Sequence, residues 1–291
     1  MIMTSALPRP DVCEVCAGHL QRLGVITTAP LPAGEPHFRR FDRAIWMCRV
    51  CKHRMVEGPY ADTEHYENLG AETPWSREQA HPTMARVKAM LPDNASILDV
   101  GCNTGEMLSA HFQGHTWFGV EPNRGAANVA ESHGIRILAP TLECLEPANH
   151  LGSFDAVFAF DVIEHLENPG GWIRKARRLL KPGGILVLET GRADALVPRV
   201  ERLRWYYLRF FEHLRAYSTA SITKTLDDAG FQKPRIFKHS HSGSRFRNYG
   251  PPGLKGLLAN ALHLNRIGPD RDGPVFFPFR DHMTIVSRPK S

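Results

Sequence analysis

The sequence predicts an α/β fold with a doubly wound parallel sheet, preceded by a small metal-binding module. Three observations support this: an apolar strand that runs into a glycine turn at 97–105, a second strand that ends in an acid at 121, and two Cys-x2-Cys pairs before residue 52. A short apolar strand of this kind is buried on both faces, as the strands of a parallel sheet are. The paired cysteines are typical of a metal site in a protein that has no disulfides.

The N-terminal segment carries four cysteines in two knuckles, Cys13-x2-Cys16 and Cys48-x2-Cys51. The first residues show no basic start followed by an apolar stretch, so we expect no signal peptide and a cytoplasmic protein. In that setting, two such pairs indicate a tetrahedral zinc site rather than disulfides. Four thiolates leave no open coordination position, so we expect one structural zinc per chain.

Alternatives to this zinc site stay open. The two pairs could be unrelated reduced thiols, and His37 or His53 could replace one of the thiolate ligands. Cys102 and Cys144 stand alone and are expected to be packing residues. We place the zinc module at residues 1–58.

The glycine turn and the strand-end acid predict a nucleotide ligand. Gly101 and Gly105 bracket a turn in which the backbone can approach a ligand closely. Glu121 ends the strand WFGVE, 20 residues after Gly101, a spacing that suits hydrogen bonds to a ribose. A pyrophosphate cofactor would favour G-x-G-x-x-G, and Glu106 in the first helical turn would repel it. S-adenosylmethionine (SAM) has the ribose without the phosphate and fits better.

Later motifs resemble those of the class I SAM-dependent methyltransferases, in the family's order. They are FDAVFAFDVIEHLENP at 154–169, LLKPGGILVLET at 179–190 and LDDAGF at 226–231, and the resemblance spans 85–237. It implies a Rossmann-like sheet of seven strands and SAM as the cofactor. Asn103 stands where the family usually has a third glycine, and asparagine tolerates positive φ better than other residues with a side chain.

The resemblance also implies which residues bind SAM. The methionine and ribose side is lined by residues at the end of the first strand: Asp99, Gly101, Asn103 and Gly105. Glu121 holds the ribose hydroxyls. The adenine pocket is closed by residues after the third strand, Thr141, Leu142 and Glu143, and Phe160 and Asp161 at the end of the fourth strand lie below the sulfonium. Asp99 has a competing role as a turn-capping residue.

The rest of the chain divides into a linker and a core. Residues 59–94 carry helical periodicity near their end and resemble the family's cap over the SAM site. The methyltransferase domain is placed at 95–291, with its final strand at 282–287. Residues 239–280 replace a short hairpin of the family and are expected to be an insertion or lid.

Residues 200–214, VERLRWYYLRFFEHL, place six apolar side chains within a narrow arc of a helical wheel. Arg202 and Arg209 face the opposite way. This pattern predicts an amphipathic helix packed on the sheet. A phosphate-binding or substrate-gating role for its arginines is the alternative.

Methyl transfer needs a general base when the acceptor carries a proton. The catalytic candidates are His165, next to the methyl-transfer position, and His213, in a segment E-H-L-x-x-Y-S that similar enzymes of secondary metabolism present to the substrate. Glu212 and Tyr217 are further candidates. Ser218 or Thr219 is expected to cap the helix that follows. His165 has an alternative role in holding its turn by hydrogen bonds.

The acceptor is expected to be a polar or anionic small molecule. The cysteine pairs, followed by Tyr60, Tyr66 and His81, resemble the N-terminal part of bacterial deoxysugar C-methyltransferases and favour a sugar, a nucleotide sugar or another natural-product intermediate. Those enzymes continue with a further large C-terminal domain, whereas this sequence has about fifty residues after the expected sixth strand. The formal net charge of +6 is spread along the chain, so nucleic acid is not an expected partner. The alternatives are an RNA methyltransferase with a zinc-ribbon arm and a SAM-binding scaffold without turnover.

Overall fold

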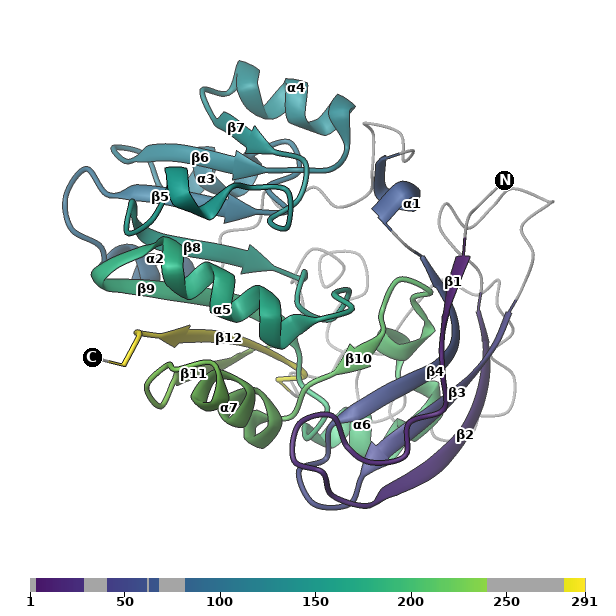
Figure 1. The fold of residues 1–291 in the computed structure, drawn as a ribbon. Helices are drawn as coiled ribbons and strands as arrows, with labels where there is room; N and C mark the ends of the chain where they lie inside the picture. Colours follow the sequence, from purple (N-terminus) through teal and green to yellow (C-terminus); the bar gives the residue numbers. More distant parts are fainter. Residues whose placement is uncertain (1–3, 29–40, 62, 68–81, 240–279, 291) are drawn as a thin grey trace, which may run out of the picture.

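The described residues form two β-sheets, and a strand from the C-terminal half of the chain completes the N-terminal one. The computed structural model describes residues 4–28, 41–61, 63–67, 82–239 and 280–290, and the structural statements below concern these ranges. Figure 1 shows a large sheet with helices around it and a smaller N-terminal sheet beside it. The short strand β10 lies between them.

The N-terminal sheet has the strand order β1-β4-β3-β2, and β10 pairs with β4. All of its pairings are antiparallel. β4 continues to Ala61, so the expected module boundary at 58 falls inside a strand. Its strands are β1 (Thr4–Leu7), β2 (Leu20–Thr28), β3 (Phe41–Cys48), β4 (Arg54–Ala61) and β10 (Arg215–Ala216).

The large sheet has seven strands in the order β11-β12-β9-β8-β5-β6-β7, as the family resemblance implied. β12 runs antiparallel to both of its neighbours, and the other pairings are parallel. The carboxyl ends of the parallel strands therefore meet along one edge. The strands are β5 (Ser96–Val100), β6 (Thr116–Val120), β7 (Arg136–Ala139), β8 (Phe154–Phe160), β9 (Leu180–Gly191), β11 (Arg235–His239) and β12 (His282–Ser287).

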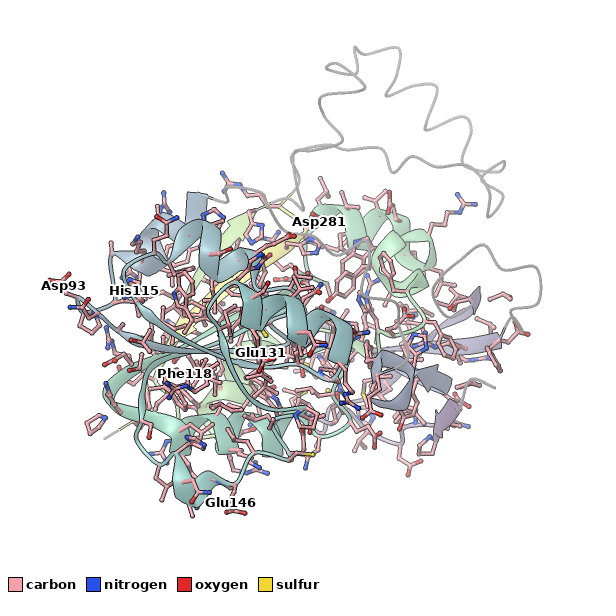
Figure 2. The ribbon with its side chains drawn as sticks, turned by 90° about the horizontal axis from the view of Figure 1, so that it is seen from above. Asp93, His115, Phe118, Glu131, Glu146 and Asp281 are labelled. Atoms are coloured by element: carbon pink, nitrogen blue, oxygen red, sulfur yellow. The ribbon has the colours of Figure 1, made fainter. Side chains whose placement is uncertain are left out.

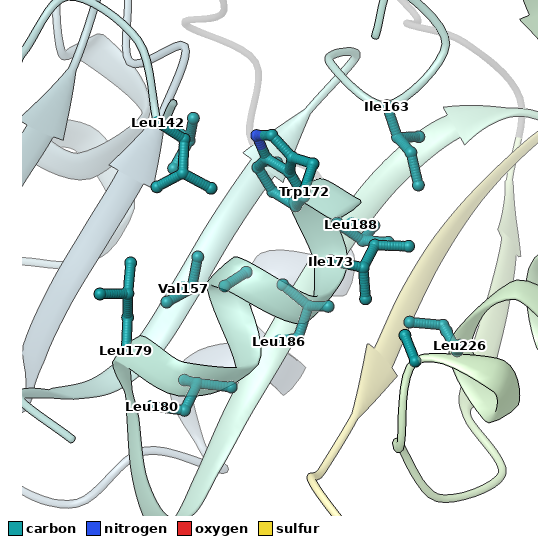
Figure 3. Close-up of a cluster of buried hydrophobic side chains, with 14 of the residues drawn as sticks. Leu142, Val157, Ile163, Trp172, Ile173, Leu179, Leu180, Leu186, Leu188 and Leu226 are labelled. Carbon is teal, nitrogen blue, oxygen red and sulfur yellow. The ribbon is translucent and has the colours of Figure 1, made fainter. Parts of the chain in front are cut away.

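Helices cover both faces of this sheet. On one face, α5 and α7 pack on β8 and β9, where α5 buries Trp172 and Ile173 (Figure 3). On the other, α2, α3 and α4 contribute to a second cluster. Glu131 lies on the exposed side of α4 (Figure 2). The helices are α1 (Thr63–Glu67), α2 (Pro82–Lys88), α3 (Glu106–His111), α4 (Arg124–Ser132), α5 (Pro169–Leu179), α6 (Leu196–Glu201) and α7 (Thr219–Asp228), with 3-10 turns η1 (Pro147–Asn149), η2 (Arg202–Arg204) and η3 (Tyr206–Arg209).

Most of the expected local elements are confirmed. The glycine turn opens α3, Ser218 caps α7 through a capping box with Ser221, and the last strand is 282–287. Of the expected insertion at 239–280, residues 240–279 lie outside the described residues, as do His37 and His81, and His239 is the last residue of β11. No described helix is long and apolar enough to cross a membrane.

The prediction of one amphipathic helix over 200–214 is wrong. α6 ends at Glu201, two 3-10 turns follow, and Arg202 has a φ of 56°. Buried arginines of the N-terminal sheet explain the interruption. Arg43 donates to the carbonyls of Phe210 and Phe211, and to that of His213; Arg54 donates to those of Pro198 and Arg202. Carbonyls held by guanidinium groups do not need helical partners. The side chains of Trp205, Tyr207 and Leu208 pack in one cluster with apolar residues of the N-terminal sheet, whereas Val200 is exposed.

The first zinc knuckle is joined to the core by a cluster of buried polar groups. Glu14 accepts hydrogen bonds from Arg215 Nε at 2.8 Å and lies 2.7 Å from Nε2 of His53. Although burial favours the neutral acid, these two partners outweigh it and hold the pKa of Glu14 at about 2. Arg215 also donates to the carbonyl of Leu166, in the loop after β8. The module and that loop are therefore held by the same guanidinium group.

Replacing Arg215 by glutamine should destabilise the protein by about 1.5–3 kcal/mol, because the buried guanidinium loses charge-assisted hydrogen bonds to Glu14 and to the carbonyl of Leu166. Denaturant unfolding measures the change. Arg178→Gln, which alters an exposed arginine on α5, is the matched control and should stay within about 0.5 kcal/mol. Equal stability of the two variants would show that the Glu14–Arg215 pair does not join the module to the core.

Candidate functional site

The glycine turn after β5 has the geometry expected from its sequence. Gly101, Asn103 and Gly105 have φ values of 75°, 49° and 81°, in the left-handed region. A Cβ on Gly105 would lie 2.1 Å from the side chain of Ile135, so a larger residue cannot occupy this position without displacing its neighbour. The turn is therefore fixed tightly against the sheet before the first residue of α3.

Glu121 connects this turn to the end of β6. Its carboxylate accepts hydrogen bonds from the backbone N–H of Asn103 and from that of Asn123, each at 2.9 Å. Burial raises the pKa of Glu121, and the two N–H donors oppose the rise. The side chain is thus held in one orientation at the carboxyl edge of the sheet, where the sequence placed a ribose-binding acid.

The other expected SAM residues fall into two groups. Asp99 is buried on β5, and Asp161 follows β8 with a φ of 49°. Thr141 lies after β7 and is half-buried. In contrast, the side chain of Leu142 is in the hydrophobic core, and that of Phe160 packs against Phe158.

Glu143 is exposed, and its carbonyl accepts a hydrogen bond from Lys175. Together with Leu142 and Phe160, it contributes packing and loop contacts to the described structure. The polar candidates at the strand ends are the ones that the sheet brings together.

These strand ends fit SAM by the chemistry of their groups. Asp99, Glu121 and Asp161 place carboxylates at the carboxyl ends of three strands, two of which, β6 and β8, flank β5. In open α/β sheets, ligands bind outside this edge. SAM offers an ammonium, two ribose hydroxyls and a sulfonium, each of which interacts favourably with a carboxylate. Of the three acids, Glu121 is the one whose orientation two backbone donors fix.

The four paired cysteines converge on one point, as the sequence predicted. Their sulfur atoms all lie within 4.8 Å of one another. Cys13 Sγ is 3.6 Å from Cys51 Sγ, and Cys16 Sγ is 3.5 Å from Cys48 Sγ. These distances are far from a disulfide bond of about 2.05 Å. They are close to the sulfur–sulfur edge of about 3.8 Å in a zinc tetrahedron with bonds of about 2.3 Å.

His53 is not part of that tetrahedron. Its Nε2 contacts Glu14, its Nδ1 lies 3.3 Å from the hydroxyl of Ser221, and its ring packs against Tyr217. Cys102 is buried and Cys144 exposed, both outside the cluster.

The two candidate histidines lie side by side. The ring centroids of His165 and His213 are 4.8 Å apart at an interplanar angle of 73°. His213 is buried, and its Nδ1 is 2.7 Å from the carbonyl of Tyr207. Burial lowers the pKa of His213 well below its usual value, and the neighbouring His165 adds to this effect. The ring is therefore neutral near pH 7, and the same burial makes it a weaker base than a free imidazole.

A carboxylate next to this pair was missed by the sequence reasoning. Glu164 is fully buried and accepts hydrogen bonds from the hydroxyls of Tyr207 at 2.5 Å and Thr190 at 3.1 Å. Burial and the nearby Asp161 raise the pKa of Glu164 to about 8. Its position directly before His165 was the available signal. Tyr207, in the segment predicted as a helix, had none.

The two further catalytic candidates point elsewhere. Glu212 Oε1 lies 3.4 Å from His65 Nε2 on α1, and its carbonyl is 3.0 Å from His165 Nδ1. Tyr217 is buried with its ring against His53, toward the zinc knuckle. The hydroxyl of Tyr66, also on α1, lies 2.9 Å from His165 Nδ1. The expected cap at 59–94 therefore contacts His165 through Tyr66 in the part that the structure describes.

Comparisons with known proteins agree with this geometry. A family model described as a methyltransferase domain matches residues 75–234. A ubiquinone biosynthesis O-methyltransferase of Dinoroseobacter shibae is 30% identical over 206 residues, covering 66% of this chain and 73% of that protein. A tRNA U34 carboxymethyltransferase of Hydrogenovibrio crunogenus is 29% identical over 167 residues, covering 50% and 45%.

The chain spans less than two thirds of the length of some of these curated relatives. One is a ubiquinone biosynthesis O-methyltransferase of Azorhizobium caulinodans, which is 30% identical over 152 residues. That match covers 48% of this chain and 60% of that protein. Among solved structures, the YcgJ protein of Bacillus subtilis superposes with a TM-score of 0.53 at 16% identity, covering 73% of this chain and 100% of that one. At that identity the superposition shows a shared fold.

Proposed function

Since this chain belongs to the class I SAM-dependent methyltransferases, we propose that it transfers the methyl group of SAM to an oxygen atom of a polar small molecule. One observation supports this above the others. The Glu121-bound glycine turn and the cluster of His165, His213 and Glu164 lie at the same edge of the sheet. The first suits the cofactor and the second suits an acceptor that must lose a proton.

The acceptor class follows from the relatives and from the site. The names of the ubiquinone biosynthesis relatives specify O-methylation of a biosynthetic intermediate. Two imidazole rings beside a carboxyl group suit a hydroxyl group better than an apolar carbon. A hydroxylated intermediate of natural-product biosynthesis is therefore the first candidate, and a sugar or nucleotide sugar is the second.

A screen with labelled SAM tests this proposal. The full chain is incubated with three pools, hydroxyaromatic acids, nucleotide sugars and unmodified tRNA, and the products are separated by mass spectrometry. We expect label in a small-molecule product with a new methoxy group. SAM binding without transfer to any pool would favour the scaffold alternative, and label in tRNA would favour RNA.

RNA is kept as a second candidate because of the tRNA U34 carboxymethyltransferase relative. A protein that binds RNA through phosphates loses affinity steeply as salt increases. If tRNA is the substrate, its binding should weaken by orders of magnitude between about 50 and 200 mM salt. Binding of a small acceptor should change far less.

We further propose that the four-cysteine cluster holds one structural zinc. The thiolates of Cys13, Cys16, Cys48 and Cys51 would close the tetrahedron, leaving no position for a substrate. The ion would then hold the N-terminal sheet together rather than take part in methyl transfer.

His213 is the residue whose loss is expected to affect the acceptor side most. His213→Ala should lower turnover on the acceptor found in the screen at least tenfold, about 1.4 kcal/mol in barrier, with SAM affinity nearly unchanged. His213→Asn keeps a donor for the carbonyl of Tyr207 and should be equally slow, since it also lacks Nε2. Calorimetric titration of SAM and initial rates are the measurements. Restored turnover in the asparagine variant would make His213 a structural residue and His165 the better candidate.

A further inference from the structure

A group of three ligating side chains lies outside the cysteine cluster. Glu164 and His165 come from the loop after β8, and His213 from the segment before β10. One ligand atom from each side chain lies within 4.8 Å of those of the other two. The hydrogen bond from Thr190 to Glu164 places the group at the end of β9, at the carboxyl edge of the large sheet.

The hydrogen bonds of the two histidines bear on which nitrogen is available to a metal. His213 Nδ1 is 2.7 Å from the carbonyl of Tyr207, which only accepts, so this ring carries hydrogen on Nδ1 and has its lone pair on Nε2. His165 Nδ1 lies 3.0 Å from the carbonyl of Glu212 and 2.9 Å from the hydroxyl of Tyr66, which can donate or accept. Metal-binding histidines are commonly oriented in this way, through a donor bond from the other nitrogen to a carbonyl.

The carboxylate is oriented in a comparable way. Glu164 accepts one hydrogen bond on each oxygen, from Tyr207 and from Thr190. Both donors are neutral hydroxyls, and the side chain is fully buried. A cation bound between Glu164 and the two imidazoles would stabilise the ionised form of this side chain, which burial otherwise disfavours.

Tyr207 is held in place by a close approach of the backbone. A Cβ on Gly191 would lie 2.5 Å from the ring of Tyr207, so only glycine permits this packing. The N–H of Gly191 donates to the Tyr207 hydroxyl at 3.0 Å. The tyrosine thus orients Glu164 through its hydroxyl and His213 through its carbonyl.

From this arrangement we infer that Glu164, His165 and His213 form a site for a divalent first-row cation with open coordination positions. Two imidazoles and one carboxylate are the donor set of catalytic zinc and of non-haem iron sites, in which the remaining positions take water or substrate. The site would differ from the cysteine cluster, whose four thiolates leave no position open.

The function of this cation rests on the proposed methyl transfer. A hydroxyl bound to it would lose its proton to water more readily, because a divalent ion lowers the pKa of a bound oxygen group. The oxygen lone pair then forms the bond to the methyl carbon, the carbon–sulfur bond breaks, and its electron pair stays on sulfur. The imidazole lone pairs that could accept a proton would hold the ion instead.

Metal binding is measured without SAM or acceptor, so its outcome is independent of the methyltransferase assay. The full chain with zinc in its cysteine cluster is titrated with Mn²⁺, and free Mn²⁺ is followed by electron paramagnetic resonance. Manganese prefers oxygen and nitrogen ligands over thiolates. In parallel, native mass spectrometry counts zinc ions per chain at excess zinc.

We expect one saturable Mn²⁺ site and a second zinc ion per chain. Glu164→Gln and His165→Gln should each weaken Mn²⁺ binding at least tenfold and remove the second zinc. Glu131→Gln makes the same chemical change on the exposed side of α4 and should bind as the unmodified chain does (Figure 2). Circular dichroism confirms that each variant is folded.

The inference is overturned if the unmodified chain shows neither a saturable Mn²⁺ site nor a second zinc. It is also overturned if binding is the same in the Glu164, His165 and Glu131 variants. Either result leaves the methyl-transfer proposal standing, since the screen with labelled SAM decides that separately.

Discussion

Replacing Glu121 by alanine should weaken SAM binding by about 1.5–3 kcal/mol, the range for losing hydrogen bonds to a charged group. The carboxylate is fixed by the N–H groups of Asn103 and Asn123, so it needs little reorganisation to meet the ribose. The same bonds hold the glycine turn to β6, so the variant loses both a ligand contact and part of the support for the turn. Calorimetric titration of SAM measures the effect.

Two variants separate these contributions. Glu121→Gln keeps an oxygen that can accept from one of the two N–H groups and should lose less affinity than alanine does. Glu131→Ala removes an exposed glutamate of α4 and should leave SAM affinity unchanged. Unchanged affinity in Glu121→Ala would show that the end of β6 does not bind the ribose.

Cys13→Ser should abolish zinc binding and unfold the N-terminal sheet. Structural zinc contributes about 10–16 kcal/mol of apparent binding energy in small zinc-finger peptides, so a defective site loses most of the module's stability. Metal analysis should find one zinc per unmodified chain and none in the variant. Cys144→Ser replaces an exposed cysteine outside the cluster and is the matched control. Protein purified without chelator that lacks zinc, or that has disulfides between the pairs, would contradict the site.

The structure adds a consequence for activity. SAM binding should persist in Cys13→Ser within a few-fold, because the glycine turn and Glu121 lie on β5 and β6, outside the N-terminal sheet. Turnover should fall, because the N-terminal sheet holds the acceptor side. Arg43 donates to the carbonyl of His213, and the hydroxyl of Ser218 donates to that of Cys51. A variant with full turnover and no zinc would show that these contacts are dispensable.

The sequence was informative wherever a few neighbouring residues determine the structure. The left-handed turn at Gly101 and Gly105, the cap at Ser218 and the strand at 282–287 each depend on local conformational preference or burial pattern. The two cysteine knuckles are also local features, since each pair places its two thiolates within four residues of the chain. Their spacing alone predicted the convergence that the structure shows.

The failed helix prediction has a physical cause in distant partners. The helical pattern at 200–214 was real in the sequence, but the carbonyls of that segment are taken by Arg43 and Arg54, which lie far away in the chain. The place of Leu142 in the hydrophobic core is likewise set by distant residues, and its contact with adenine stays a prediction. A pattern of neighbouring residues does not show which distant side chain will compete for their backbone carbonyls.

The sequence by itself therefore determined the fold class, the glycine turn and the convergence of the four paired cysteines, because these depend on short-range spacing. The tertiary structure alone decided that β10 joins the N-terminal sheet, that Arg215 connects the zinc knuckle to the loop after β8, and that Glu164 and His165 meet His213. Contacts of this kind arise when distant segments are buried together, and their energies depend on desolvation and on partner geometry that only the folded chain provides.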